Sequence, residues 1–308
     1  PYTTPIMAST PSPTSDPTLA PVSDSPTLAP TTILPALNLP NYTLQTISQD
    51  QYSPQAKAYF WFEKSYSLVN LEDMEQWCKH QLFGLATLFY ALEGSTWDGK
   101  DRQNWLKDDL SECEWATYKT AIACDNLDRV VFISLMDFEK DAFYGTIPPE
   151  IELLPSLRSI QIDNAGYTEA LGNVLPTEIG NLQHLKQVRF AQNRLGGTLL
   201  ILDNSLAYLT QIATLDLQNN VLSGTLTTEL GLLTSLTSLY LNGNQFWGTI
   251  PTESGLLTGL ETFWLYDNNL SGVVPDTLCE LTLEDSGLTM LWVELRQVEC
   301  PANDCICY

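Results

Sequence analysis

Basic residues are scarce in this 308-residue chain, which has 14 Lys and Arg against 37 Asp and Glu and a formal net charge of −23. So acidic a chain repels the phosphates of nucleic acids and the headgroups of anionic membranes. No run approaches the roughly 18 to 20 apolar residues of a membrane span, and no charged-then-apolar signal peptide stands at the start. The chain opens at Pro1 without a Met, which predicts a processed product or a fragment.

Catalytic and metal-binding motifs are also lacking. The two histidines, His80 and His184, are far apart in sequence, with no evident nucleophile or orienting carboxylate. There is no Gly-x-Ser-x-Gly, phosphate loop, His-Glu-x-x-His or Cys-x-x-Cys with a histidine partner. Residues 137–141 have the alternating acidic residues that begin a calcium-binding loop. Such a loop needs Gly at its sixth position and Glu at its twelfth, but here these positions hold Ala142 and Pro148. We therefore expect no enzyme, no cofactor and no specific metal site, only diffuse association of calcium with the acidic surface.

One phrase repeats between residues 157 and 275 at a spacing of about 24 to 28 residues. It has the form Leu-x-x-Leu-x-Leu-x-x-Asn-x-Leu-x-Gly, and its fullest copies begin at Leu185, Ile212, Leu236 and Leu260. This is the leucine-rich-repeat signature, in which each unit gives a short parallel strand and a return segment. No unit buries its own apolar face, so neighbours must stack into one core. The repeat predicts an α/β solenoid of about seven coils, from near Val130 to near Leu288.

Composition divides the chain into four regions. Residues 1–40 are expected to form a Pro/Ser/Thr-rich extended tail, 41–128 a helical N-terminal cap, 129–287 the repeats, and 288–308 the last coil and a Cys-rich C-terminal cap. Inside the repeats, one asparagine per unit is expected to join a ladder that satisfies backbone groups of the turns, at Asn193, Asn220, Asn244 and Asn268.

The N-terminal cap carries clear helix signals. Ser53 and Pro54 predict a capped helix that runs to about Glu63, and a longer helix is predicted over 71–92, ending before Gly94. The aromatic and aliphatic residues of these helices are enough to seal the first coil, namely Trp61, Trp77, Phe83, Leu85, Leu88 and Phe89.

The tail repeats Pro-Thr-Leu-Ala-Pro at 17–21 and 26–30. Polyproline II has three residues per turn, so positions three apart share a face, and one such face carries Leu19, Val22, Leu28, Leu34 and Leu37. Two interpretations stay open: this face packs on another copy of the chain, or it reflects a duplication with no binding role. Such stalks are often O-glycosylated, with candidates here at Thr14, Thr18, Ser23, Ser25, Thr27 and Thr31.

The seven cysteines all lie outside the repeats. Cysteines confined to the two open ends of a solenoid predict disulfide staples on the caps and an oxidising compartment, hence a secreted or cell-surface location. Cys113 with Cys124 is the preferred first bridge, and Cys305 and Cys307 are each expected to pair with Cys279 or Cys300. Cys78 is left over; a buried thiol is favoured, with an intermolecular bridge or a partner lost by truncation as alternatives. In a secreted chain, the sequons beginning at Asn41 and Asn269 predict N-glycosylation.

Stacked coils align their solvent-facing strand positions into columns on the concave face. One column reads Ser134, Gln161, Arg189, Asp216, Tyr240, Trp264 and Trp292, and the next reads Met136, Asp163, Ala191, Gln218, Asn242, Tyr266 and Glu294. The C-terminal half thus gathers Tyr240, Trp264, Tyr266 and Trp292, which core packing does not require. Exposed Tyr and Trp clusters suit partner binding and sugar stacking. The alternative is that the C-terminal cap or a glycan covers them.

The Gly-Thr-Ile-Pro motifs at 145–148 and 248–251 resemble the plant-type extracellular repeats of receptor-kinase ectodomains and polygalacturonase inhibitors. The cap motifs Ser-Pro-Gln at 53–55 and Glu-Cys-Glu-Trp at 112–115 are similar to the cap of secreted leucine-rich-repeat proteins of diatoms. The resemblance covers about residues 53–308 and implies fold and secretion. The chain departs from the plant cap where Ala-Ile-Ala precedes Cys124, and it lacks the longer Cys-rich end.

We therefore predict a non-catalytic, secreted, glycosylated binding protein. The favoured role is a structural subunit of an extracellular fibril or cell-wall matrix, in which the tail of one copy packs against the solenoid of another. The alternative is a ligand-recognition module, such as a receptor ectodomain or glycanase inhibitor, that uses the concave aromatic residues. Its partners would be other copies, extracellular proteins or polysaccharides, with no nucleic acid and no membrane insertion.

Overall fold

The computed structural model describes residues 33–66, 68–107, 109–117, 119–136, 145–163, 175–199, 208–282, 287–293 and 298–300. The predicted packing residues Leu19, Val22 and Leu28 and all the O-glycosylation candidates lie outside these ranges, as do Cys305 and Cys307. None of the helices in the described ranges is long and apolar enough to cross a bilayer.

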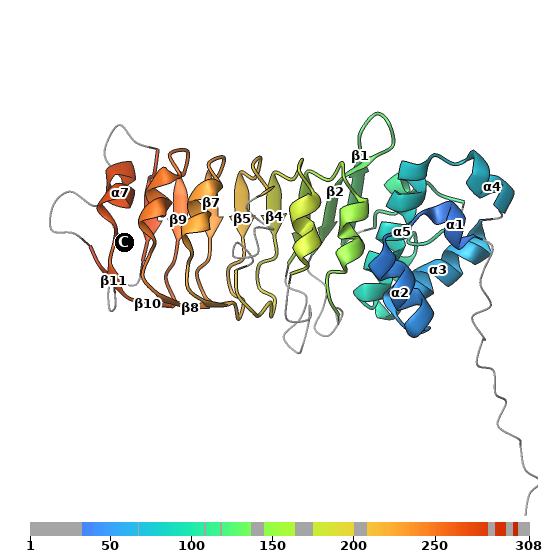
Figure 1. The fold of residues 1–308 in the computed structure, drawn as a ribbon, viewed down its shortest axis with the longest axis horizontal. Helices are drawn as coiled ribbons and strands as arrows, with labels where there is room; N and C mark the ends of the chain where they lie inside the picture. Colours follow the sequence, from blue (N-terminus) through green and yellow to red (C-terminus); the bar gives the residue numbers. More distant parts are fainter. Residues whose placement is uncertain are drawn as a thin grey trace, which may run out of the picture. The chain divides into compact units, whose positions relative to one another are not determined.

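The coils stack through an eight-stranded sheet in the order β1-β2-β3-β4-β5-β7-β9-β12 (Figure 1). Its strands are β1 (Thr120–Cys124), β2 (Val130–Leu135), β3 (Ser159–Ile162), β4 (Gln187–Arg189), β5 (Thr214–Asp216), β7 (Ser238–Tyr240), β9 (Thr262–Trp264) and β12 (Met290–Trp292). β1 pairs antiparallel with β2, and each following pair is parallel. The central residues Val188, Leu215 and Leu239 are register partners and fully buried. The predicted parallel-strand solenoid is confirmed.

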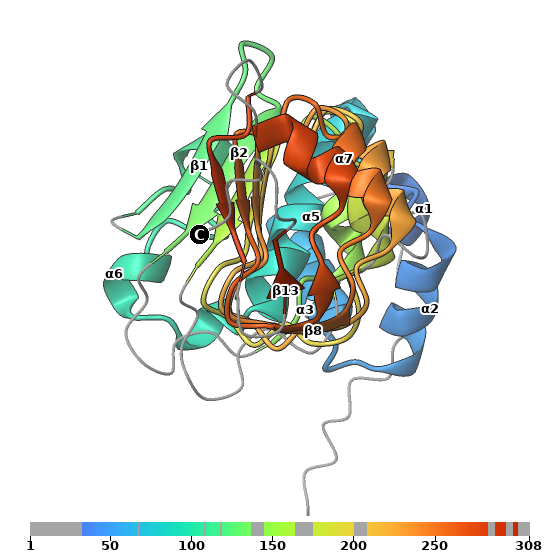
Figure 2. The ribbon, with the colours of Figure 1, turned by 90° about the vertical axis from the view of Figure 1, so that its left-hand side faces the viewer.

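The return segments form the other sides of the coils (Figure 2). A second sheet has the order β10-β8-β6, and β11 pairs with β13. The strands are β6 (Ser223–Gly224), β8 (Gln245–Gly248), β10 (Asn269–Leu270), β11 (Gly272–Val273) and β13 (Val298–Glu299). Short helices complete the coils, at η3 (Pro149–Leu153), η4 (Thr177–Asn181), η7 (Thr228–Leu232), η8 (Thr252–Leu256), α7 (Asp276–Cys279) and η9 (Glu280–Thr282).

The predicted asparagine ladder is present inside the coils. The Asn220 Nδ2 donates to the carbonyl of Phe190 at 2.8 Å, and its Oδ1 accepts from the backbone N–H of Leu195 at 3.0 Å. Asn244 and Asn268 repeat the pattern one and two coils later. Because turn backbone groups are buried here, each amide supplies hydrogen bonds that water cannot.

The N-terminal cap is a bundle of short helices, namely α1 (Leu34–Leu37), α2 (Asn41–Gln49), α3 (Pro54–Ser65), α4 (Leu68–Asp73), α5 (Gln76–Ala91), η1 (Gly94–Thr96), α6 (Gly99–Arg102) and η2 (Glu112–Glu114). The predicted start of α3 is confirmed, since the Ser53 hydroxyl accepts from the Ala56 N–H at 3.1 Å. The single helix predicted over 71–92 is wrong. Glu75 takes an extended conformation that separates α4 from α5, and both Leu71 and Phe83 are fully buried in the same core.

Residues 33–40 differ from the expected extended tail. Leu34–Leu37 form the α1 helix, and Leu37 is fully buried in the cap of its own chain. Ile33, which lies off the predicted polyproline face, is 3% exposed. Leu34 and Leu37 therefore do not belong to an extended tail face, because their apolar side chains are used within this chain.

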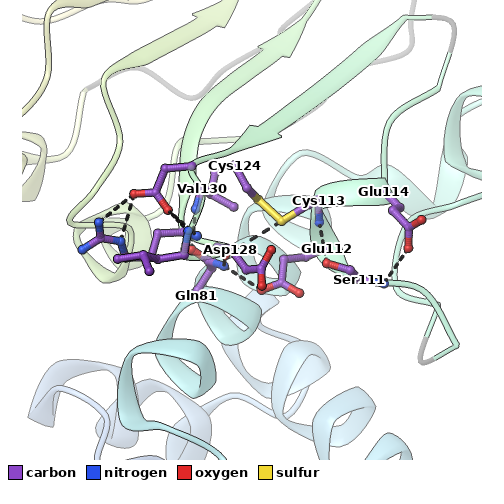
Figure 3. The surroundings of a disulfide bond; sticks show 11 residues. Gln81, Ser111, Glu112, Cys113, Glu114, Cys124, Asp128 and Val130 are labelled. Atoms are coloured by element: carbon purple, nitrogen blue, oxygen red, sulfur yellow. Dashed lines mark hydrogen bonds and ion pairs between the residues drawn. A yellow bond between two sulfur atoms is a disulfide. The ribbon is translucent and has the colours of Figure 1, made fainter.

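Hydrogen bonds from α5 join the cap to the first strands beside the Cys113–Cys124 disulfide (Figure 3). The Gln81 Nε2 donates to Glu112 Oε1 at 2.6 Å and to the Asp128 carbonyl at 2.8 Å. Its Oε1 accepts from the Val130 N–H at 2.6 Å. The predicted bridge is confirmed, and one buried amide ties helix, turn and strand together.

A second junction centres on Glu150 of η3, which is fully buried. The Thr43 hydroxyl donates to Glu150 Oε1 at 2.7 Å, and Gln55 Nε2 donates to Oε2 at 2.9 Å. Burial raises the pKa of Glu150 above its ordinary value, although these two donors act in the opposite direction. Glu150 therefore anchors α2 and α3 to the first coils.

We predict that Glu150→Ala lowers the free energy of unfolding by about 2 to 4 kcal/mol, because it leaves two buried donors without acceptors. Urea unfolding followed by circular dichroism measures the change. Glu178→Ala, at the equivalent position of η4, is the matched control and should cost less than about 0.5 kcal/mol, as is usual for surface substitutions. Equal losses in the two variants would contradict the anchoring role.

Glu150→Gln should also change how stability depends on pH. Because the folded-state pKa of Glu150 is raised, the folded protein holds this proton more tightly than the unfolded chain. The wild type should therefore lose stability relative to Glu150→Gln as pH rises from about 4.3, the ordinary glutamate pKa, through the folded pKa. Paired urea titrations between pH 4 and 7 measure the gap, and a constant gap would refute this origin.

Candidate functional site

The predicted concave column is formed by register partners in the main sheet. Ser134 pairs with Gln161, Gln161 with Arg189, and Arg189 with Asp216. Asp216 then pairs with Tyr240, Tyr240 with Trp264, and Trp264 with Trp292. The inward neighbours Leu239, Phe263 and Leu291 are buried, so the column faces away from the core.

The C-terminal half of this column forms an aromatic cluster with Tyr266 of the next column. We call this cluster the aromatic face and define it as Tyr240, Trp264, Tyr266 and Trp292. Trp264 stacks on Trp292 with ring centroids 5.4 Å apart and an interplanar angle of 18°. Tyr240 meets Trp264 edge to face at 4.9 Å, and Tyr266 lies 5.5 Å from Trp292. Trp292 is the most open member, at 38% exposed. The rings thus contact one another, and Trp292 leaves the largest fraction of its side chain to solvent.

Two buried polar atoms at the aromatic face have no hydrogen-bond partner among the described residues, namely Trp264 Nε1 and Asn242 Oδ1. Asn242 is 2% exposed. Burial raises the pKa of Tyr266, with Asp267 adding to the effect, while a hydrogen bond from Asn242 opposes it. Buried polar atoms without partners are rare in native structures and need a specific explanation.

The N-terminal half of the concave face is charged and internally paired. Arg189 Nε bonds the Asp163 carboxylate and lies 3.7 Å from Asp216 Oδ2. Burial raises the pKa of both aspartates; Arg189 opposes this for Asp163, and hydrogen bonds from Gln218, with the charge of Arg189, oppose it for Asp216. Burial alone would lower the Arg189 pKa, but the hydrogen bond and charge of Asp163, with the charge of Asp216, raise it. Both carboxylates thus share one guanidinium within the sheet, so Arg189 already has partners inside this chain.

The other predicted residues lie elsewhere. Cys279 and Cys300 are disulfide-bonded. His80 Nε2 lies 2.8 Å from Gln76 Nε2 and 3.1 Å from the Leu37 carbonyl, which makes it a hydrogen-bonded cap histidine. The described residues contain no group of His, Cys, Asp and Glu able to hold a metal ion.

Sequence reasoning missed a cavity of about 390 Å³ beside the cap, lined by Trp77, Gln81, Leu127, Arg129, Pro155 and Ser156. Trp77 was expected in the cap seal but is 38% exposed, and Leu127 is 61% exposed. The sequence signal that could have indicated this cavity is Leu127, an apolar residue in the polar turn between β1 and β2.

Comparison with known proteins identifies the repeat. Residues 235–257 and 259–281 match the Leucine Rich Repeat family. These coils are leucine-rich repeats. No curated protein matches the sequence. The resemblance to diatom proteins stays a prediction.

Solved structures of plant proteins share the fold, among them one described as a leucine-rich-repeat ectodomain. A plant ice-binding protein is 26% identical, with a TM-score of 0.56 over 70% of this chain and 63% of its own. Pollen Receptor Kinase 3 is 26% identical, with a TM-score of 0.54 over 65% and 89%. The ectodomain of the Arabidopsis thaliana receptor kinase GASSHO1/SCHENGEN3 is 26% identical, with a TM-score of 0.55 over 66% and 22%. This chain therefore spans less than two thirds of the ice-binding protein and under a quarter of that ectodomain.

Cys78 is a free, half-buried thiol, and burial raises its pKa to about 11 with help from Glu112 and Asp128. At pH 8 the thiolate fraction should therefore be about two hundred-fold below that of a thiol with the ordinary pKa of about 8.5. We predict correspondingly slow alkylation of Cys78 by iodoacetamide, measured by peptide mapping. Urea-unfolded protein is the control and should label quickly. Fast labelling of the folded protein, or a Cys78-linked dimer on a non-reducing gel, would contradict the buried thiol.

Proposed function

We propose that this chain is a non-catalytic extracellular recognition module that binds a protein partner through the aromatic face. The observation that carries the proposal is the gathering of Tyr240, Trp264, Tyr266 and Trp292 on the solvent side of three neighbouring strands and the segment after β9. Inward-facing residues of the same strands already fill the core. The cluster therefore lies outside a core that other residues already fill.

Clustered Tyr and Trp side chains are typical of binding hot spots, because they bury large areas at low entropic cost. Trp264 Nε1 and Asn242 Oδ1, which have no partner in the described part of the chain, add one donor and one acceptor to the cluster. A bound partner could supply hydrogen bonds to both atoms. This supports binding over the alternative that the aromatic face is merely covered.

The ring geometry favours a protein partner over a sugar platform. Sugars stack on open aromatic faces, whereas Trp264 places one face against Trp292 and meets Tyr240 edge to face. Ring edges and a single open indole suit insertion of apolar side chains. The net charge of −23 favours a basic partner, whose association should weaken with salt. A similar solved ectodomain, that of GASSHO1/SCHENGEN3, is in complex with a partner, CASPARIAN STRIP INTEGRITY FACTOR 2.

An extracellular location is supported by the Cys113–Cys124 disulfide and by the bonded Cys279 and Cys300, because such bridges persist in oxidising compartments. Fibril assembly through the tail stays a prediction. Leu19, Val22 and Leu28 lie outside the described residues, and Leu37 is used within the cap.

Selection of peptides from a random displayed library on the full chain tests the proposal. Peptides that bind the aromatic face should lose at least about thirty-fold in affinity for Trp292→Ala, the effect of a hot-spot residue. Trp77→Ala is the matched control, because Trp77 is equally exposed at 38% but lies on the cap. A glycan array on the same variants completes the test. Peptides indifferent to Trp292→Ala, or glycans that depend on it, would refute a protein partner at this face.

A further inference from the structure

Trp247 and Asn269 stand side by side on the outer sheet. Trp247 of β8 is the direct register partner of Asn269 of β10, and the two strands are parallel neighbours (Figure 1). Phe246 and Leu270 turn into the core, so Trp247 and Asn269 both project outward. Trp247 is 56% exposed, an unusual position for a large indole that the aromatic face does not use.

Asn269 also begins an Asn-Leu-Ser sequon, in which Asn269 and Ser271 are both exposed. The second sequon differs, because Thr43, two residues after Asn41, is fully buried and donates to Glu150. An acceptor asparagine and an exposed aromatic ring therefore share one surface at the Asn269 site. The repeat spacing does not reveal this pair. Leu236 and Leu260 begin successive repeats 24 residues apart, whereas Trp247 and Asn269 are 22 residues apart. The outer strands therefore pair two residues out of step with the repeat alignment.

We propose that Asn269 carries an N-linked glycan whose first N-acetylglucosamine rests on the indole of Trp247. The inference requires the secretory route of the proposed function but not its binding face. In the modification, Asn269 Nδ2 forms a bond to C1 of a sugar held on a lipid pyrophosphate carrier. The C1–O bond to the pyrophosphate breaks, the lipid pyrophosphate leaves, and the amide loses one proton.

The geometry suits this contact. Adjacent parallel strands lie about 4.8 Å apart, so side chains of register partners run alongside each other. The indole of Trp247 and a sugar on Asn269 Nδ2 are both joined to their Cα atoms through a few bonds. The two rings therefore lie at similar distances above the plane of the outer sheet. The C–H face of the sugar then packs on the aromatic ring. The glycan would also shield β10, the edge strand of its sheet, from pairing with another chain.

The test uses the full chain secreted from eukaryotic cells, as wild type, Ser271→Ala, Trp247→Ala and the double variant. Ser271→Ala removes the sequon but keeps Asn269. Intact mass should show one glycan fewer in Ser271→Ala than in the wild type. Its Tm should be lower by on the order of 2 °C, and this difference should vanish in the Trp247→Ala background. Enzymatic trimming to a single N-acetylglucosamine should leave the wild-type Tm unchanged.

The Asn41 sequon supplies the control. Any Tm change caused by Asn41→Gln should be the same in the wild-type background and in the Trp247→Ala background. The proposal is overturned if Asn269 is unmodified, if Ser271→Ala does not lower the Tm, or if the decrease persists when Trp247 is Ala. Peptide binding to the aromatic face is measured separately. Failure of the glycan proposal therefore leaves the proposed function standing, and failure of the proposed function leaves the glycan proposal standing.

Discussion

The structure depends on one constraint: a single repeat cannot bury its apolar face, so coils must stack in parallel register. Register places Val188, Leu215 and Leu239 over one another inside the sheet. It also aligns the asparagine ladder, in which each amide bonds the neighbouring coil as well as its own. The same alignment turns equivalent outward positions into columns. A side chain at an outward position of one repeat therefore contacts side chains of the neighbouring repeats, which lie more than 20 residues away in sequence.

The open ends follow from the same constraint. The first coil needs a seal, and the cap supplies it with buried aromatic residues and with two polar anchors, Gln81 and Glu150. Along the concave face, chemistry changes from the paired Arg189 and Asp163 to the aromatic rings of Trp264 and Trp292. Arg189 already has its partners within the sheet, whereas the aromatic part keeps exposed surface and two buried polar atoms that have no partner among the described residues. We therefore propose the C-terminal half as the binding surface.

The sequence predicted what the repeat period controls and missed what tertiary packing decides. The concave columns followed directly, because spacing and register together determine which residues align. The break at Glu75 was missed because apolar periodicity continues across it. Leu37 was assigned to a tail by composition, although one short helix was enough to bury it in the cap. The pairing of Trp247 with Asn269 could not be predicted, because the outer strands are offset from the repeat alignment.

The most direct test of the aromatic face is a nitrogen–proton spectrum of the eight indole groups, recorded with and without a selected peptide. Each indole N–H gives its own signal, so the binding surface is read without mutation. We predict that the Trp264 and Trp292 signals shift, with the largest change at Trp264 Nε1 as its missing hydrogen bond forms. The cap indoles and Trp247 should stay unchanged. Shifts confined to Trp77 or Trp247 would place binding elsewhere and contradict the account.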